Sequence, residues 1–344
     1  MKSKATIKEI AKLANVSIGT VDRVIHKRGD VSKNTTERIQ KIMGEIDYEP
    51  NTFARNLALN KNFQIAVLLP EHGKEEYWST PMKGARKAAK DMNSLGLKIN
   101  YYSYDQYRKE SFFSAGRRAL KDKNDALVLA RVLYEETEIF LKECAKADVP
   151  FVLIGTTVDS MNAVSNIGQD SFQSGRLAAE LLSFGYTAPS SFLVLNLTKA
   201  ENPNYNVKHR IEGFHSYFKG REDIAHTIDI LTIAQEDKNL LKKIKAELTT
   251  SDLNGIFVPN SRSYMLAQAL SDKRNIRIVG YDLLDKNKAF MQNGKIDFLI
   301  NQRSDEQAYQ GIECLYRYLV MNQVPPKIIS LPLDIVTKEK LMYY

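Results

Sequence analysis

From residue 63 onward, short apolar runs alternate with longer segments in which apolar residues recur at helical spacing. Alternating β and α units fold as doubly wound parallel sheets, which bind ligands at the carboxyl ends of their strands. We therefore expect most of the chain to form an α/β domain with a binding site at the strand ends. The predicted strands are 64–69, 98–104, 126–130, 151–155, 191–197, 255–259, 276–281 and 298–301, and the predicted helices are 81–92, 112–120, 135–147, 175–184, 210–218, 240–249, 264–272 and 306–321.

The N-terminal part of the chain is more basic than the rest. Residues 1–61 hold 12 Lys and Arg against 7 Asp and Glu, whereas the other residues of the 344-residue chain hold 37 against 34. A basic surplus in a short segment is typical of a head that binds a polyanion, but charge alone leaves a solvated basic surface equally open. At about 100–200 residues per domain, the length favours two or three domains.

The first fifty residues predict an all-α head of three short helices. Thr6 and Glu9 can form a capping box, in which each side chain bonds the backbone amide of the other. Asn15 tolerates the left-handed conformation that ends a helix, Ser17 can cap the second helix, and a third follows residue 32 or 35. Two helices joined by a tight turn are typical of a helix-turn-helix, although periodicity alone leaves a plain three-helix bundle open.

The same segment resembles the opening of LacI-family repressors. The match begins with the run TIKEIAKLANVS at 6–17 and continues with Thr-Val at 20–21, Arg-Val at 23–24 and Val-Ser at 31–32. It closes with Tyr-Glu-Pro-Asn at 48–51, Ala-Arg at 54–55 and Leu57. Ordered matches over about sixty residues are far more specific than a short motif. The resemblance implies a sequence-specific transcription regulator, commonly a repressor, with residues 1–49 as its helix-turn-helix DNA-binding domain.

The resemblance also implies which residues of the head contact DNA. Arg23 can bond guanine at O6 and N7, and Ile18 can touch a thymine methyl group. Gly19 departs from the family pattern by offering no side chain, and Asp22 replaces a small residue, so it either accepts from a cytosine amine or supports Arg23. We therefore expect an operator that differs from those of better-known relatives. The expected DNA-binding residues of the head are Thr6, Ser17, Ile18, Gly19, Thr20, Asp22, Arg23, His26 and Asn34, with Ser17, Thr20, His26 and Asn34 as phosphate contacts.

Residues 50–62 form the predicted hinge. Asn51 can cap a helix there, but a helix this short is marginal alone, since about 12–15 residues are usually needed in water. The resemblance implies that the hinge folds only on operator DNA, beside its copy in a second subunit, with Leu57 wedged into a minor-groove base step. Asn51, Ala54 and Arg55 are the other expected DNA contacts. The alternative is a passive linker in which Leu57 is simply buried.

Residues 63–344 resemble periplasmic sugar-binding proteins of the ribose-binding class, as the sensors of LacI-family proteins do. The resemblance implies two similar doubly wound lobes, three crossovers between them and a cleft for a small sugar-like effector. An effector can alter DNA affinity only by binding one hinge spacing better than the other. We expect lobe 1 at 63–165 and 294–322 and lobe 2 at 166–292 and 326–344, with crossovers near 165–167, 292–294 and 322–326.

Polar and aromatic residues at the predicted strand ends form the candidate effector site. An aromatic wall suits the apolar face of a sugar ring, and charged side chains give the stronger hydrogen bonds to hydroxyl groups. Simpler alternatives exist: Asp282 and Asp170 as helix caps, Arg210 paired with Glu212, and Trp78 in the core. The expected effector-binding residues are Tyr77, Trp78, Asp105, Arg131, Asp170, Arg210, Asn260, Asp282 and Gln302.

The sequence offers no catalytic or cofactor motif. Nucleotide-binding, nucleophile-elbow and zinc-protease motifs are absent and the five histidines form no metal-type cluster, so we expect no enzyme, metal or cofactor. Cys144 and Cys314 lack metal-type spacing, and we expect reduced thiols. Neither a signal peptide nor an apolar run of the ~20 residues that span a bilayer is present, so we expect a cytoplasmic protein without membrane contact.

The expected partners are double-stranded operator DNA, a sugar or sugar-derivative effector and a second copy of the chain. A homodimer follows from the paired hinges and from the two-fold symmetry of operators, and no heptad tail points to a tetramer. Two alternatives remain open, namely a sugar-binding protein without a regulatory role and a sugar-converting α/β enzyme. The identity of the effector, its sign of action and the operator sequence are not encoded in any one residue.

Overall fold

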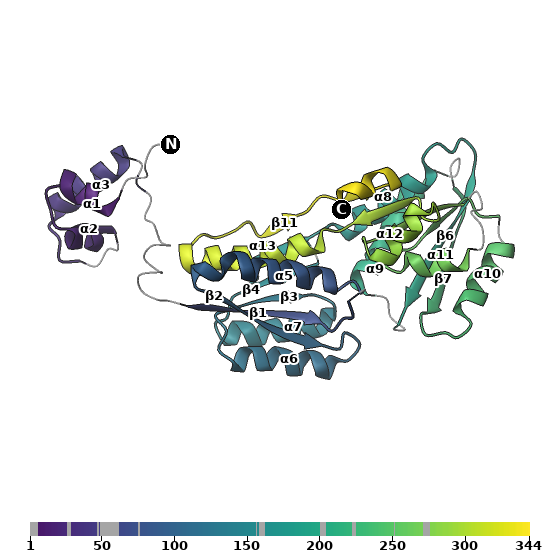
Figure 1. Ribbon diagram of the computed structural model, residues 1–344, viewed down its shortest axis with the longest axis horizontal. Helices are drawn as coiled ribbons and strands as arrows, with labels where there is room; N and C mark the ends of the chain where they lie inside the picture. Colours follow the sequence, from purple (N-terminus) through teal and green to yellow (C-terminus); the bar gives the residue numbers. More distant parts are fainter. Residues whose placement is uncertain are drawn as a thin grey trace. The chain divides into compact units, whose positions relative to one another are not determined.

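The chain divides into two compact units, Met1–Lys61 and Asn62–Tyr344 (Figure 1). The computed structural model describes residues 6–25, 29–46, 48, 62–74, 76–155, 157, 162–199, 204–221, 225–250, 252–270 and 276–344. Within these ranges, no helix combines the length and the apolar character needed to cross a bilayer. Cys144 and Cys314 are both free thiols.

The first unit contains the three helices that capping residues predict. The Thr6 hydroxyl accepts from the Glu9 amide at 3.3 Å, and the Thr6 amide donates to the Glu9 carboxylate at 2.6 Å. Asn15 has a φ of 50°, which turns the chain between the first two helices. A small apolar core that includes Ile10 and Ile39, both fully buried, holds the helices together. The helices are α1 (Ile7–Leu13), α2 (Ile18–Ile25) and α3 (Lys33–Glu45).

The second unit alternates strands and helices as expected for an α/β domain. Its strands are β1 (Phe63–Pro70), β2 (Leu97–Tyr104), β3 (Ala126–Ala130), β4 (Phe151–Ile154), β5 (Ser165–Gly168), β6 (Ser190–Thr198), β7 (Ala225–Ala234), β8 (Gly255–Phe257), β9 (Arg277–Tyr281), β10 (Phe298–Asn301), β11 (Ile328–Ser330) and β12 (Asp334–Val336). Its helices are α5 (Ser79–Met92), η1 (Asn93–Leu95), α6 (Lys109–Lys121), α7 (Tyr134–Lys146), α8 (Ser171–Ser183), α9 (Tyr205–Phe218), α10 (Leu240–Thr250), α11 (Ser263–Ala269), α12 (Asp285–Gln292), α13 (Ser304–Met321) and η2 (Lys338–Tyr343).

The strands form two six-stranded sheets, one in each lobe. The first has the order β11-β5-β4-β3-β1-β2 and its strand pairs are parallel. The second has the order β12-β10-β9-β8-β6-β7, and only its β10–β12 pair is antiparallel. Each sheet thus presents the carboxyl ends of its central parallel strands along one edge, where ligands of doubly wound folds bind.

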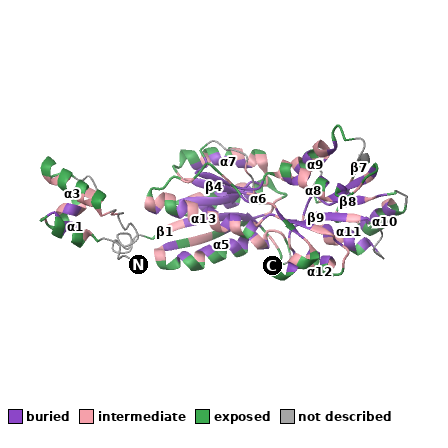
Figure 2. Cartoon of the chain, turned by 90° about the horizontal axis from the view of Figure 1, so that it is seen from above, coloured by how far each residue is buried: buried purple, intermediate pink, exposed green. Residues whose placement is uncertain are grey.

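Helices cover both faces of each sheet. In β1, Ile65 and Val67 pack beneath α5 and α13, whereas Ala66 and Leu68 pack against α6 and α7, because successive strand residues point to opposite faces. The second sheet is covered likewise by α8 and α9 on one face and by α10, α11 and α12 on the other. Figure 2 shows the buried residues gathered on the strands and on the sheet-facing sides of the helices.

The strand pairing moves all three crossovers from the expected places. The strands β5 and β11 both belong to the first sheet, and β10 belongs to the second. The chain therefore changes lobe near residues 169–170, 302–303 and 331–333, later than the expected 165–167, 292–294 and 322–326. The first and third crossovers lie later because β5 and β11, two short strands that the sequence analysis did not predict, pair within the first sheet. The second lies later because β10 pairs with β9 in the second sheet.

The three crossovers meet at one side chain. Gln169, in the first crossover, donates from Nε2 to the backbone oxygen of Asn301 at 3.2 Å and to that of Pro332 at 2.6 Å. These two acceptors stand beside the second and third crossovers. A single buried amide thus joins the three segments that connect the lobes.

Candidate functional site

One face of α2 does not pack against the apolar core of the head and is exposed to solvent. Val21 and Val24 point into that core, whereas Ile18, Gly19 and Arg23 are exposed. Ile18 leaves 49% of its surface in solvent. The exposed face coincides with the residues expected to read base edges.

Asp22 lies beside the C-terminal part of the head. Burial and then the Asp22 carboxylate raise the pKa of the Tyr48 hydroxyl, so the two groups are close. Asp22 is only half-exposed. The sequence suggested two other roles for Asp22, namely accepting from a cytosine amine or supporting Arg23. Its proximity to Tyr48 could not be predicted locally, because the two residues are 26 positions apart in the chain.

Four of the expected DNA-binding residues lie at the starts of helices. The Ser17 hydroxyl accepts from the Thr20 amide at 3.1 Å and lies 2.9 Å from the Thr20 hydroxyl, while Thr6 opens α1 and Asn34 is exposed in the first turn of α3. Backbone N–H groups at such starts favour anions. The other expected DNA contacts lie outside the described residues: His26, Asn51, Ala54, Arg55 and Leu57.

In the second lobe, three expected residues form one hydrogen-bonded chain at the strand ends. Gln302, which follows β10, accepts from Arg210 Nη2 at 2.5 Å and donates to Asp282 Oδ1 at 2.9 Å. Arg210 also donates to the backbone oxygen of Pro259 at 3.0 Å. The three side chains are all at least nine-tenths buried. Arg210 therefore pairs with this cluster and not with Glu212, which lies 4.0 Å from Lys208.

Asp282 is a buried carboxylate that follows β9. Burial raises the pKa of Asp282 to about 6, although Arg210 and the bond from Gln302 oppose the shift. Its φ of 66° is in the left-handed region, so the backbone turns sharply away from the strand at this point. The Arg210 guanidinium stacks 4.0 Å from the ring centroid of Tyr281. The cluster thus holds both a buried cation and a buried anion.

Tyr77 and Asn260 extend this cluster. Tyr77 belongs to the first lobe, yet burial and the Asp282 carboxylate of the second lobe raise the pKa of its hydroxyl, which bonds to Ser304. Asn260 follows β8 and donates to the backbone oxygen of Leu197 at 2.8 Å. We use the name strand-end site for Tyr77, Arg131, Arg210, Asn260, Asp282 and Gln302.

Arg131 occupies the end of β3 in the first lobe. It is only 6% exposed and its Nη2 donates to Glu138 at 2.6 Å. Its guanidinium stacks 3.7 Å from the ring centroid of Tyr134. Arg131 Nε and Nη1, and Arg210 Nε, are buried without a hydrogen-bond partner.

The other three residues expected to bind the effector, Trp78, Asp105 and Asp170, make contacts that shape the local structure. Trp78 packs against the core of the first lobe and donates from Nε1 to Gln106 at 3.1 Å. Asp105 accepts from the Tyr107 amide at 2.9 Å and so shapes a turn, and Asp170 caps α8 by accepting from the Gln173 amide at 2.9 Å. Within the described ranges, no hydrogen bond joins these three side chains to the strand-end site.

The sequence analysis missed the residues that connect the lobes. Tyr134 stacks on Tyr205 of the second lobe with centroids 4.9 Å apart, and the Tyr205 ring lies 4.1 Å from that of His209. Asn206 donates to the backbone oxygen of Gly155 at 2.9 Å. The sequence feature that came closest to indicating this contact is Tyr134, an aromatic residue three positions after Arg131. Its partner, Tyr205, is 71 positions away along the chain, so the pair could not be predicted from local sequence.

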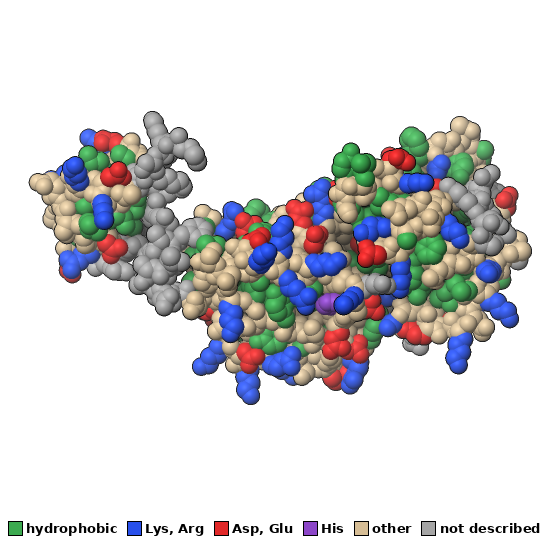
Figure 3. Space-filling view, viewed as in Figure 1, with side chains coloured by type: hydrophobic (Ala, Val, Ile, Leu, Met, Phe, Trp, Pro, Cys, Tyr) green, Lys and Arg blue, Asp and Glu red, His purple; other side chains and the backbone are tan. Residues whose placement is uncertain are grey.

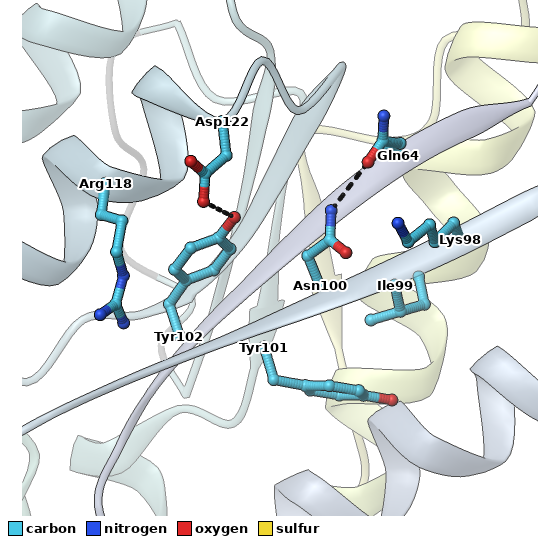
Figure 4. Close-up of a pocket in the computed structure, with 8 residues that line it drawn as sticks. All are labelled: Gln64, Lys98, Ile99, Asn100, Tyr101, Tyr102, Arg118 and Asp122. Carbon is cyan, nitrogen blue, oxygen red and sulfur yellow. Dashed lines mark hydrogen bonds between the residues drawn. The ribbon is translucent and has the colours of Figure 1, made fainter.

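Two hollows lie on the second unit, and residues of the strand-end site line neither of them. Figure 4 shows one of about 590 Å³ beside the edge strand β2, where Asn100 bonds to Gln64 and Tyr102 bonds to Asp122. The other, of about 500 Å³, lies near Arg303 and Asp334.

Figure 3 shows basic and acidic side chains interspersed over one face of this unit. The described part of the chain contains no group of three or more His, Cys, Asp and Glu placed to hold a metal ion.

Comparison with family models resolves the identity of the chain. Residues 65–323 match the model described as a periplasmic binding protein domain, and residues 6–51 match that of the bacterial regulatory proteins of the lacI family. The chain belongs to the LacI family. It is a DNA-binding transcription regulator with a two-lobed domain of the periplasmic-binding-protein fold, as its sequence indicated.

Relatives of this LacI-family chain are themselves transcription regulators. It is 29% identical to the regulator DegA of Bacillus subtilis over 61% of this chain, an alignment that spans only 60% of DegA. It is 26% identical to the ribose operon repressor of B. subtilis over 81% of each chain. Among solved structures, a Bacteroides fragilis protein assigned to the LacI transcriptional regulators matches with a TM-score of 0.75 and 25% identity, covering 83% of this chain and 100% of that one.

Proposed function

We propose that this LacI-family regulator represses a carbohydrate-related operon and that a small sugar-like effector, bound at the strand-end site, controls its affinity for DNA. The observation that carries the proposal is the buried Arg210–Gln302–Asp282 chain at the strand ends. It offers donors and acceptors side by side, as vicinal hydroxyl groups require. The similarity to a ribose operon repressor supports a carbohydrate link.

The contacts between the lobes supply a route from effector to DNA. Tyr134 of the first lobe stacks on Tyr205 of the second, and the Asp282 carboxylate of the second lobe acts electrostatically on the Tyr77 hydroxyl of the first. A ligand that touches both lobes at the strand-end site stabilises the arrangement in which they meet. The ligand changes the affinity for DNA only to the extent that it binds this arrangement of the lobes more tightly than the other arrangement.

The DNA half of the proposal rests on the exposed face of α2 and on the hinge. We propose that the head spans residues 1–49 and the hinge 50–62, that Arg23 reads a guanine, and that Leu57 enters the minor groove beside its copy in a second subunit. A homodimer acting in the cytoplasm on a two-fold symmetric operator follows from this arrangement.

The strand-end site favours binding over catalysis. Arg210, Gln302 and Asp282 bond to one another, and no Ser or Cys nucleophile paired with a His base is found among the residues of the site. We therefore propose that the sugar leaves this site unchanged, without a metal or other cofactor.

Titration of promoter DNA tests the proposal. Full-length protein is titrated with DNA from its own promoter region, with and without a panel of sugars, at fixed salt, because phosphate contacts make affinity salt-dependent. We expect specific binding, its loss in Arg23→Ala, and a shift with one sugar that Gln302→Ala abolishes. Tight sugar binding without specific DNA binding would overturn the regulatory half of the proposal. Specific DNA binding that no sugar shifts would overturn the effector half.

A further inference from the structure

The strand-end site contains a buried cation that the protein only partly satisfies. Arg131 has a side chain that is 3% exposed, and a guanidinium group stays charged at all ordinary pH values. Its one carboxylate partner among the described residues is Glu138, whose side chain is 39% exposed and bonds only Nη2. A buried charge is costly unless its hydrogen-bonding capacity is filled.

The unfilled positions are all hydrogen-bond donors. Arg131 Nε and Nη1 lack a partner in the first lobe, and Arg210 Nε lacks one in the second. The Asp282 carboxylate, by contrast, already accepts from Gln302. A ligand that completes this site must therefore bring acceptors to Arg131, where a hydroxyl group would be the weaker choice and an anionic oxygen the stronger.

Arg131 stands where the lobes meet. It follows β3, whose last residue, Ala130, is paired with Ile154, so Arg131 is next to Gly155, which accepts from Asn206 of the second lobe. Tyr134 lies between the Arg131 guanidinium and the Tyr205 ring. An acceptor bound to Arg131 is thus enclosed by both lobes and shielded from water, which strengthens a charged hydrogen bond.

We propose that the effector carries an anionic group, a carboxylate or a phosphate, that binds Arg131, while its hydroxyl groups bind the Arg210–Gln302–Asp282 chain. This inference rests on the proposed function, because it takes the strand-end site to be the effector site. It narrows the effector from sugars in general to sugar acids and sugar phosphates.

Matched pairs of ligands test the inference on the unmodified protein. Calorimetry compares D-glucuronate with D-glucose, D-galacturonate with D-galactose, and the 5-phosphate of D-ribose with D-ribose. We expect one anionic member to bind at least about tenfold more tightly than its neutral partner, since one charged hydrogen bond is worth that much. The uronates and the phosphate separate the two anionic classes.

Three variants locate the effect. Arg131→Gln should reduce the preference for the anion over its neutral partner to about onefold. Glu138→Gln should retain or enlarge the preference, because it removes the competing carboxylate. Arg117→Gln is the matched control: Arg117 also pairs with a glutamate, Glu143, at 2.7 Å, but its side chain is 61% exposed.

The outcomes separate the inference from the function on which it rests. A neutral sugar that binds as tightly as its anionic partner and shifts DNA affinity overturns the inference and leaves the proposed function standing. An anion preference that persists in Arg131→Gln also overturns the inference. If no member of any pair binds, both the inference and the effector half of the proposed function fail.

Discussion

Tyr134 and Tyr205 stack face to face across the two lobes, with ring centroids 4.9 Å apart and planes inclined by 20°. Tyr134 begins α7 in the first lobe, and Tyr205 begins α9 in the second. The pair therefore forms only when the lobes meet, and it stabilises that arrangement together with the Asn206–Gly155 hydrogen bond.

Replacing Tyr205 by Ala should weaken effector binding without unfolding the protein. The stack is half-exposed, and an aromatic pair contributes about 0.5–1.5 kcal/mol, or roughly 2- to 10-fold in affinity. Calorimetry with the ligand of the matched pairs that binds most tightly measures the change. Tyr101→Ala, at an exposed ring on β2 outside the strand-end site, is the control and should bind as the wild type does. Equal affinity in Tyr205→Ala would show that the stack does not contribute to binding.

Gly175→Ala should displace Arg210. A Cβ at Gly175 would lie 1.9 Å from the backbone oxygen of Arg210, because α8 and α9 touch there backbone to backbone. We expect a loss of stability of roughly 1–3 kcal/mol, with weaker effector binding. Chemical denaturation and calorimetry measure the two effects. Glu180→Ala, on the exposed side of α8, should change neither. Unchanged stability in Gly175→Ala would mean that the helices separate at little cost.

Asp282→Asn should change how stability depends on pH. Burial raises the pKa of Asp282 from 3.8 to about 6, so the folded protein keeps a proton that the unfolded chain loses between these values. Stability therefore falls as pH rises from about 4 to 6, by on the order of 2–3 kcal/mol from this group. The amide side chain in the variant cannot ionise. The melting temperature of the variant should therefore rise relative to that of the wild type as the pH increases from about 4 to 6. Asp285→Asn, at an exposed carboxylate, should not gain; parallel pH profiles for wild type and Asp282→Asn would contradict the prediction.

Gly19→Ala should stabilise the head and test its contact with DNA. A Cβ there would meet only the Ser17 hydroxyl, at an ordinary 3.7 Å, and alanine favours a helix over glycine by about 1 kcal/mol. Thermal melting of the full-length protein should show a more stable head. If α2 approaches the bases closely at Gly19, operator affinity falls in the same variant. Gly44→Ala in α3, which has nothing within 4 Å of its Cβ, should stabilise without affecting DNA binding.

Local sequence was sufficient to predict the three helices of the head and eight strands of the α/β domain, but it did not predict β5, β7, β11 or β12. The Thr6–Glu9 capping box and the left-handed Asn15 are encoded by residues a few positions apart, and the structure contains both. Asp282 and Gln302 were predicted to lie together because parallel strands share one carboxyl edge, and they bond directly. Polar residues after apolar strands thus marked the second-lobe part of the site.

Tertiary structure decided what depends on distant partners. β5 joins the first sheet by pairing with β4, whereas β11 joins it only by pairing with β5, across more than 150 residues, and this pairing places the third crossover after β11. The hydrogen bond from Trp78 to Gln106, 28 positions away, also depends on the fold, whereas the Asp170 cap is a local contact with Gln173.

The sequence by itself determined the three helices of the head and the alternating strands and helices of an α/β domain, because capping, periodicity and strand-end position are local properties. Its resemblance to LacI-family repressors and to periplasmic sugar-binding proteins implied the helix-turn-helix reader and the two lobes. Only the tertiary structure decided which arginine would be buried with unfilled donors. Arg131 is an ordinary charged residue after a strand until Tyr134 and Tyr205 enclose it, and that enclosure requires two lobes to meet.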